Sequence, residues 1–257
     1  MSPSKKERIE FLVKNLYQLH DGQIYWIEKI VRQFNSPYKF SRLKDSDVVS
    51  ERFLQDFGDA LRIHHCFSNE AFSKDKFEYV TNWVLNLIGV QSQLAPKGNP
   101  GHDITIENVR FSLKTQADKN IKRDYVHISK FMELGKGTWH SDEEDLIGLR
   151  EQFFSHMKAY DRILTLRALS SSSQQAHYEL VEIPKCLLEE AKLGNFEMKF
   201  DSTQTPKPGY CHIYDQDNNL KFELYFDGGT ERKLQIKNLG KHYCLVHANW
   251  VFDILNP

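Results

Sequence analysis

The sequence predicts an α/β fold in which a mixed central sheet is flanked by helices. Three observations carry this prediction. Apolar residues recur at helical spacing through residues 1–68, helical and alternating stretches intermix over 69–195, and short alternating stretches separated by turn residues fill 196–257. The chain has 257 residues, of which 40% are hydrophobic, which is enough to bury one large core. We therefore expect a single domain with an all-α N-terminal part, a central α/β core and a β-rich C-terminal part.

Four helices are expected before residue 90. Apolar spacing places them at residues 9–17, 24–31, 46–63 and 69–88. The last has the strongest signal, because Phe77, Val80 and Val84 fall on one face. Asn69 or Ser73 can cap its N-terminus and Gly89 can end it. A polar loop rich in glycine and proline is expected at 91–101.

Alternating and helical segments follow one another in the rest of the chain. Two strands joined by a tight Glu107-Asn108 turn are expected at 103–106 and 109–115. Beyond them we expect helices at 125–134 and 149–160, strands at 163–169 and 177–183 with a flexible tip at 170–173, and a helix at 184–193. A β-meander is expected from strands at 196–200, 210–214, 220–226, 233–237 and 243–247.

Composition excludes several classes of protein. No stretch approaches the roughly 20 apolar residues that a membrane span needs, and the charged N-terminus lacks the apolar run of a signal peptide. The four cysteines are scattered, which argues against a disulfide framework or a structural zinc site and favours the cytoplasm. A formal net charge of −1 argues against a protein that coats nucleic acid through charge alone, but not against one that grips DNA locally.

The segment from Gly101 to Gln116 holds the residues with chemical potential. In the strand at 109–115, Val109, Phe111 and Leu113 point one way, whereas Ser112, Lys114 and Gln116 point the other way. Asp103 begins the neighbouring strand, and a two-residue turn brings the chain back past it. Asp103 and Lys114 are therefore expected to face one another across a hairpin.

These residue types suit phosphodiester hydrolysis. A hard cation such as Mg²⁺ prefers oxygen ligands, which Asp103 and the Leu113 carbonyl can supply. Lys114 can orient or deprotonate a water molecule, or stabilise the phosphate as a point charge. The spacing alone equally fits a surface hairpin with an aspartate near its start and a lysine on its wet face.

The hairpin and the helix before it resemble the PD-(D/E)xK nucleases, and type II restriction endonucleases in particular. Gly101-His-Asp103 corresponds to the "PD" element, Ser112-Leu-Lys114 to "(D/E)xK", and Lys76-Phe-Glu78 to the glutamate motif on the preceding helix. The resemblance covers residues 70–135 and implies a nuclease core whose catalytic residues are Asp103, Lys114, Glu78 and Ser112. It implies Mg²⁺ held by Asp103, Glu78 and the Leu113 carbonyl.

Two positions depart from the family pattern. His102 replaces the proline, a position that supplies only backbone shape. Ser112 replaces the acidic residue, so one metal ligand is lost. Glu78 is the first candidate to supply the missing carboxylate, Glu107 the second and Glu133 the third. The alternative is that Ser112 marks a relative that no longer cleaves.

The resemblance implies a sequence-specific endonuclease that cuts double-stranded DNA in a bacterial cytoplasm, as a homodimer because the two DNA strands run antiparallel. Two alternatives stay open, namely a repair or junction nuclease with the same core, and a non-cleaving DNA-binding module. Lys119, Lys122 and Arg123 closely follow the catalytic strand. They either contact DNA phosphates, together with Gln116 in the DNA interface, or form an ordinary basic loop.

Overall fold

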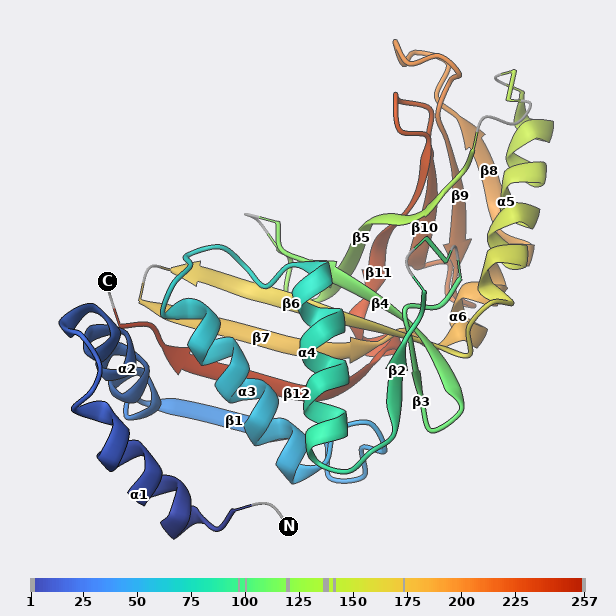
Figure 1. Ribbon diagram of the computed structural model, residues 1–257. Helices are drawn as coiled ribbons and strands as arrows, with labels where there is room; N and C mark the ends of the chain where they lie inside the picture. Colours follow the sequence, from blue (N-terminus) through green and yellow to red (C-terminus); the bar gives the residue numbers. More distant parts are fainter. Residues whose placement is uncertain are drawn as a thin grey trace.

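The computed structural model describes residues 3–96, 98–99, 101–118, 121–135, 139–140, 142–172 and 174–255, and it is an α/β protein (Figure 1). Its helical elements are α1 (Lys5–Leu16), α2 (Asp21–Phe34), α3 (Glu51–His65), α4 (Lys74–Leu87), α5 (Glu143–Met157), α6 (Lys185–Glu189) and the 3₁₀ turns η1 (Glu190–Leu193) and η2 (Lys241–Tyr243). Its strands are β1 (Tyr38–Arg42), β2 (Ser92–Leu94), β3 (Ile104–Ile106), β4 (Val109–Gln116), β5 (Tyr125–Glu133), β6 (Arg162–Ser172), β7 (Gln175–Glu182), β8 (Asn195–Met198), β9 (Gly209–Tyr214), β10 (Leu220–Asp227), β11 (Lys233–Gly240) and β12 (Leu245–Asp253).

The first sheet is mixed, as the sequence predicts. Its strand order is β1-β12-β7-β6-β4-β3-β2, and β4 pairs with β6 in parallel while the other neighbours are antiparallel. Helices α3 and α4 cross one face of this sheet (Figure 1). Phe53 and Phe57 of α3 and Phe77 of α4 pack there against Phe111 and Leu113 of β4. The apolar residues of the alternating pattern thus hold β4 against helices α3 and α4.

The second sheet contains four of the five strands of the predicted meander, and β5 takes the place of the fifth. Its order is β5-β11-β10-β9-β8, and all pairs are antiparallel. Helix α5 lies along it (Figure 1), and Phe153 of α5 is buried with Phe222 and Phe226 of β10. Ile163 and Val181, on the face of the first sheet opposite to α3 and α4, belong to the same core. The two sheets therefore share one apolar layer.

The N-terminal part is not all-α, and the last strand does not belong to the meander. Strand β1 pairs with β12, with Tyr38 opposite Phe252, and β12 also pairs with β7. A strand is predicted at 243–247, where β12 begins, but its pairing with β1 and β7 is not, because these partners lie far away in the sequence. Ser50 caps α3 by accepting a hydrogen bond from the Phe53 N–H, so this helix begins later than predicted.

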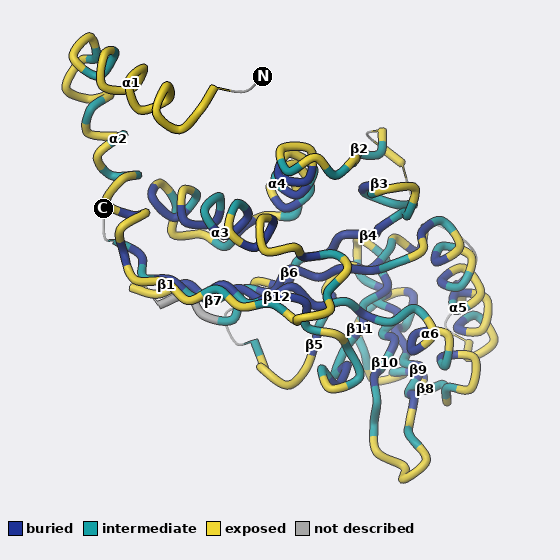
Figure 2. Tube along the Cα trace, turned by 90° about the horizontal axis from the view of Figure 1, so that it is seen from below, coloured by how far each residue is buried: buried dark blue, intermediate teal, exposed yellow. Residues whose placement is uncertain are grey.

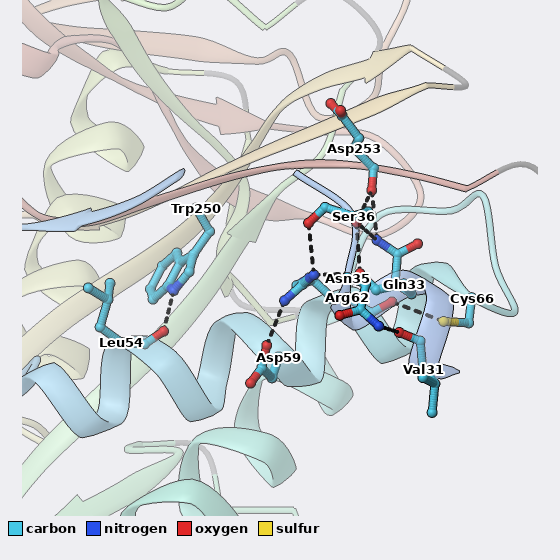
Figure 3. A network of polar contacts seen from close by, with 10 residues as sticks. All are labelled: Val31, Gln33, Asn35, Ser36, Leu54, Asp59, Arg62, Cys66, Trp250 and Asp253. Atoms are coloured by element: carbon cyan, nitrogen blue, oxygen red, sulfur yellow. Dashed lines mark hydrogen bonds and ion pairs between the residues drawn. The ribbon is translucent and has the colours of Figure 1, made fainter. Parts of the chain in front are cut away.

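A buried polar network joins the N-terminal helices to this sheet edge (Figure 3). The Arg62 guanidinium of α3 donates to the main-chain carbonyls of Gln33 and Ser36, and the Gln33 amide donates to the Asp253 carbonyl at 2.7 Å. The Trp250 indole of β12 donates to the Leu54 carbonyl at 2.8 Å. These bonds fix α2 and β1 to α3, whereas α1 contributes no buried residue.

Four further predictions differ from the structure. Residues 125–134, predicted to be helical, form strand β5, whose register against β11 shifts between Ile128 and Met132. This irregularity breaks the two-residue period and leaves apolar residues at a spacing that imitates a helix. The loop at 91–101 contains the short strand β2, and β6 continues to Ser172 through part of the predicted tip, whereas Ser173 lies outside the described residues.

Helix α5 begins at Glu143, earlier than the predicted residue 149. Asp142 and Asp145 form a capping box at its N-terminus, and the acidic first turn complements the helix dipole.

All four cysteines are free thiols. No helix in the described part of the chain has both the length and the apolar character needed to cross a membrane.

Candidate active site

The predicted hairpin is present and has the predicted turn. Strands β3 and β4 pair with Ile104 opposite Phe111 and Ile106 opposite Val109. Glu107 and Asn108 both have positive φ, 46° and 72°, which is the conformation of a two-residue type I′ turn. Its twist matches that of the strands, so the turn sets the register that brings Asp103 beside β4.

Asp103 is fastened to β4 through both its main chain and its side chain. Its N–H donates to the Phe111 carbonyl at 2.8 Å. One carboxylate oxygen, Oδ2, accepts hydrogen bonds from the Leu113 N–H at 2.6 Å and from the Ser112 hydroxyl at 3.2 Å. The hydroxyl of Ser112 thus supports the Asp103 carboxylate from the position at which the family pattern has an acid.

Gly101 allows this approach because a side chain there would collide with Ala159, which follows α5. A Cβ at Gly101 would lie 2.7 Å from the Cβ of Ala159, just past the end of the helix. The glycine therefore lets the segment before Asp103 run close to the body of the protein.

Glu78 lies beside Asp103, with Lys74 between them. The Lys74 ammonium is 2.8 Å from Asp103 Oδ1 and 2.8 Å from Glu78 Oε1. Although burial opposes the shift, the hydrogen bonds to Asp103 and Glu78 raise the pKa of Lys74. Burial raises the pKa of Glu78, against the attraction of Lys74. Sequence reasoning missed Lys74, although it stands one helical turn before Glu78, at the spacing of an ion pair.

These three side chains line a cleft of about 430 Å³. Tyr79 from α4 and Asn99 and His102 from the loop before β3 also line it. Asp103 has an exposed side-chain fraction of 15% and Glu78 of 20%, so both carboxylates are accessible from the cleft while remaining partly shielded from water.

Lys114 lies on the face of β4 opposite to α3 and α4, but this face is not exposed to solvent. Lys114 is 9% exposed and Ser112 is fully buried. Burial lowers the pKa of Lys114 to about 8, while the negative charge of Asp103 opposes that shift. The Lys114 ammonium lies 5.3 Å from the centre of the Phe131 ring of β5, and it has no hydrogen-bond partner among the described residues. The alternative interpretation, in which this lysine lies on the solvent-facing side of a surface hairpin, is therefore wrong for Lys114.

Two residues at the end of α5 join the site without any sequence signal. His156 and Tyr160 pack ring to ring at 5.4 Å, and the His156 ring lies 6.0 Å from Phe131. Burial, and secondarily the charge of Lys114, lower the pKa of His156 to about 4, and burial followed by the charge of Asp103 raises the pKa of Tyr160. His156 Nε2 and the Tyr160 hydroxyl are buried, and neither has a hydrogen-bond partner among the residues that the structure describes.

The donor set suits a hard cation. Asp103 and Glu78 both direct a carboxylate oxygen at the Lys74 ammonium, which occupies a position where a metal cation could bind. The N–H and C=O of one strand residue point to the same neighbouring strand, so the Leu113 carbonyl lies on the side of Asp103. In the described part of the chain no three His, Cys, Asp or Glu side chains cluster as a metal site. Two carboxylates suffice for Mg²⁺, which retains water and takes further oxygens from a phosphate.

The other two candidate acids lie elsewhere. Glu107 occupies the exposed hairpin turn and lines a separate pocket with Asp47 and Arg162. Glu133 ends β5 in the second sheet and pairs with Lys130 at 2.8 Å. Of the three glutamates, the structure brings only Glu78 into a contact shared with Asp103.

The predicted DNA-binding residues surround the loop after β4. Lys122 and Arg123 are exposed, whereas Lys119 lies outside the described residues. Gln116 is only 5% exposed, and its amide oxygen accepts from the Arg167 guanidinium at 2.8 Å and from the His127 N–H at 3.2 Å. Gln116 is thus engaged within the protein rather than presented on the surface.

Arg167 of β6 holds the main chain of this loop from the buried side. It is fully buried, forms an ion pair with Glu179, and donates to the carbonyls of Lys122 at 2.8 Å and Tyr125 at 2.6 Å. The carbonyls that anchor the loop are therefore bonded inward, while the side chains of Lys122 and Arg123 project outward.

Two comparisons with known proteins found matches that cover most of the chain. The family model described as SmaI, type II site-specific deoxyribonuclease, matches residues 12–252. The type II restriction enzyme SmaI of Serratia marcescens is 49% identical over 212 residues, which cover 82% of this chain and 84% of that enzyme. No solved structure matches the chain. The resemblance to type II restriction endonucleases is confirmed, and the chain belongs to the SmaI family of type II site-specific deoxyribonucleases.

Proposed function

We propose that this family member hydrolyses phosphodiester bonds of double-stranded DNA with Mg²⁺ at the site formed by Asp103, Glu78 and Lys114, within a nuclease core of the PD-(D/E)xK type. The observation that carries the proposal is the convergence of Asp103 and Glu78 on one ammonium, beside the buried Lys114 of the adjacent strand. An antiparallel β3-β4 hairpin next to a parallel strand, with α4 supplying the upstream glutamate, supports the assignment of the core.

Each residue has a role that follows from its surroundings. Asp103, Glu78 and the Leu113 carbonyl would hold the ion, and Ser112 keeps the Asp103 carboxylate in place. When bound, Mg²⁺ supplies Lewis-acid stabilisation of the charge that develops on the scissile phosphate. Lys114, with a pKa lowered to about 8 mainly by burial, can accept a proton from the attacking water near neutral pH. In its protonated form it places a positive charge beside the phosphate.

The DNA backbone would be held by the loop after β4. Lys122 and Arg123 are exposed just beyond the strand that carries Lys114, so they can reach phosphates next to the scissile bond. Gln116 contributes to the interface through its bond to Arg167, which holds the loop in shape. Lys119 belongs to the same proposed contact set by its place in the sequence.

We further propose that two copies form a homodimer through α1 and α2. Figure 2 shows these helices standing off from the two sheets. Helix α1 buries none of its residues, and Phe11, Leu12 and Tyr17 are 66%, 53% and 91% exposed. An isolated helix of this length is marginal in water, so its apolar residues need a cover. A second copy is the cover that also suits the reaction, because one active site per chain must either act twice or be duplicated to cut two antiparallel DNA strands.

A plasmid digest tests the proposed reaction. With Mg²⁺ the protein should produce discrete fragments, and EDTA should abolish them. A smear or structure-dependent nicking would indicate a repair or junction nuclease, and binding without cleavage would indicate an inactive relative. Light scattering of the protein on a cognate duplex tests the dimer. One chain per duplex would exclude it, and Phe11→Glu together with Leu12→Glu should convert a dimer into monomers.

The proposed compartment is the cytoplasm of a bacterium. The four free thiols fit a reducing compartment, and the similar enzyme is bacterial.

A further inference from the structure

Lys74 places a cation between the two carboxylates that face the cleft. Its ammonium contacts Asp103 Oδ1 and Glu78 Oε1 at 2.8 Å each. The other oxygen of Asp103 is already occupied by the Leu113 N–H and the Ser112 hydroxyl. The Asp103 oxygen that remains for a metal ion is therefore the one that Lys74 holds.

This contact differs from an ordinary ion pair along a helix. Lys74 and Glu78 are one turn apart on α4, and such a pair forms without any help from the rest of the chain. Asp103, in contrast, is the residue just before β3, and its side chain is only 15% exposed. Without Lys74, two partly buried carboxylates would face each other and repel. Their proximity requires a positive charge in this place.

We propose that Lys74 is a resident cation that holds the metal site together in the metal-free enzyme and that a divalent metal ion must displace. This inference rests on the proposed function, because it takes Asp103 and Glu78 to be metal ligands. Lys74 is suited to leaving. Its side chain is 42% exposed, and it starts in the first turn of α4 at the wall of the cleft of about 430 Å³. A flexible four-carbon stem lets the ammonium swing into that space without moving the helix.

Displacement makes metal binding weaker than the bare carboxylates would allow. The metal ion must break two ion pairs and then share the cleft with the released ammonium. Removing the ammonium should therefore tighten metal binding by about tenfold. This is the order expected when the ion no longer has to break two partly exposed ion pairs and is no longer repelled by the ammonium. The same removal should destabilise the metal-free protein, since the carboxylates then lack a counter-charge.

The test is a titration of metal-free full-length protein with Mn²⁺ in the absence of DNA, in which electron paramagnetic resonance counts the free ion. Lys74→Met and Lys74→Gln should each bind Mn²⁺ about tenfold more tightly than the unmodified protein. Lys74→Arg, which keeps the charge, should not. Lys76→Met is the matched control, because Lys76 lies on the same helix but its ammonium contacts His64 at 3.4 Å. It should leave the affinity unchanged.

Thermal melts give a second readout. Without metal, Lys74→Met should melt below the unmodified protein, and saturating Mn²⁺ should raise its melting temperature by more. Equal Mn²⁺ affinities for Lys74→Met and the unmodified protein would overturn the inference while leaving the metal site intact. If Asp103→Asn left Mn²⁺ binding unchanged in both backgrounds, the proposed metal site itself would be wrong.

Discussion

The Asp103 carboxylate accepts a hydrogen bond of 2.6 Å from the main-chain N–H of Leu113, ten residues further along the chain. This bond joins the residue before β3 to the strand that carries Lys114, so the proposed metal ligand and the proposed base belong to one rigid unit. It also accounts for the buried Ser112, whose hydroxyl donates to the same oxygen. The predictions below follow from this unit and from the groups buried around it.

Replacing Asp103 or Lys114 by alanine should abolish cleavage and leave DNA binding largely intact. Asp103→Ala removes a metal ligand worth several kcal/mol in the transition state, so we expect a loss of about a thousandfold or more. Lys114→Ala should cost roughly a hundredfold to ten-thousandfold as the loss of a general base. Cleavage rates and gel-shift affinities at a single salt concentration measure both effects. Near-normal cleavage by either variant would exclude the proposed active site.

Placing the acid of the PD-(D/E)xK pattern at position 112 should harm the protein. Ser112 is fully buried and its hydroxyl donates to Asp103. Ser112→Glu would force a longer, charged side chain against an existing carboxylate, at a cost of several kcal/mol or a strongly raised pKa. Ser112→Ala removes only one hydrogen bond and should cost about 1 kcal/mol while retaining most activity. Urea unfolding and initial cleavage rates would separate them, and a stable, active Ser112→Glu enzyme would contradict this reading.

Lys122 and Arg123 should affect DNA binding uniformly across sequences. Each phosphate contact that is lost should weaken binding and reduce the slope of log affinity against log salt by about 1. Lys122→Ala and Arg123→Ala, measured by fluorescence anisotropy between low and moderate salt, check this. Lys192→Ala, a change at an exposed position of η1, is a control that should leave the slope unchanged. Unchanged slopes in all three variants would identify an ordinary basic loop.

Arg167→Met should destabilise the fold and loosen the basic loop. The change leaves Glu179 with Lys241, at 3.2 Å, as its remaining partner, and it frees the carbonyls of Lys122 and Tyr125. Breaking a buried pair in this way typically costs about 3–5 kcal/mol. The free energy of unfolding in urea and hydrogen exchange across the loop measure the two effects. A loss below about 1 kcal/mol would mean that the network is not a structural anchor.

Acid should destabilise the protein through His65. This residue is buried, its Nε2 lies 2.8 Å from the Tyr178 hydroxyl, and burial lowers its pKa from 6.5 to about 4. The folded state therefore disfavours the protonated form. Its stability contribution is complete above pH 6.5 and is lost as the pH falls toward 4, by roughly 3 kcal/mol at most. The slope of unfolding free energy against pH should flatten in His65→Gln but not in His20→Gln, a change at an exposed position.

Local chemistry let the sequence alone predict part of the site. The Ser73 cap and Gly89 bound α4 nearly where predicted, since capping and positive φ are properties of single residues. The Glu107-Asn108 turn and the alternation of β4 then place Asp103 beside Ser112 and Leu113. The class of enzyme followed from these same short motifs.

Only the tertiary structure decided which groups surround that unit. Lys74 meets Asp103 because α4 packs against β4, and His156 and Tyr160 are buried close enough for the charges of Lys114 and Asp103 to shift their pKa values. Strand β5 and the pairing of β1 with β12 likewise depend on partners far away in the chain. The burial of the site residues also depends on elements that are far apart in the chain. A sequence shows that Lys114 shares a strand face with Ser112, but the low pKa of its amine comes from the second layer that covers that face, and no local pattern encodes that layer.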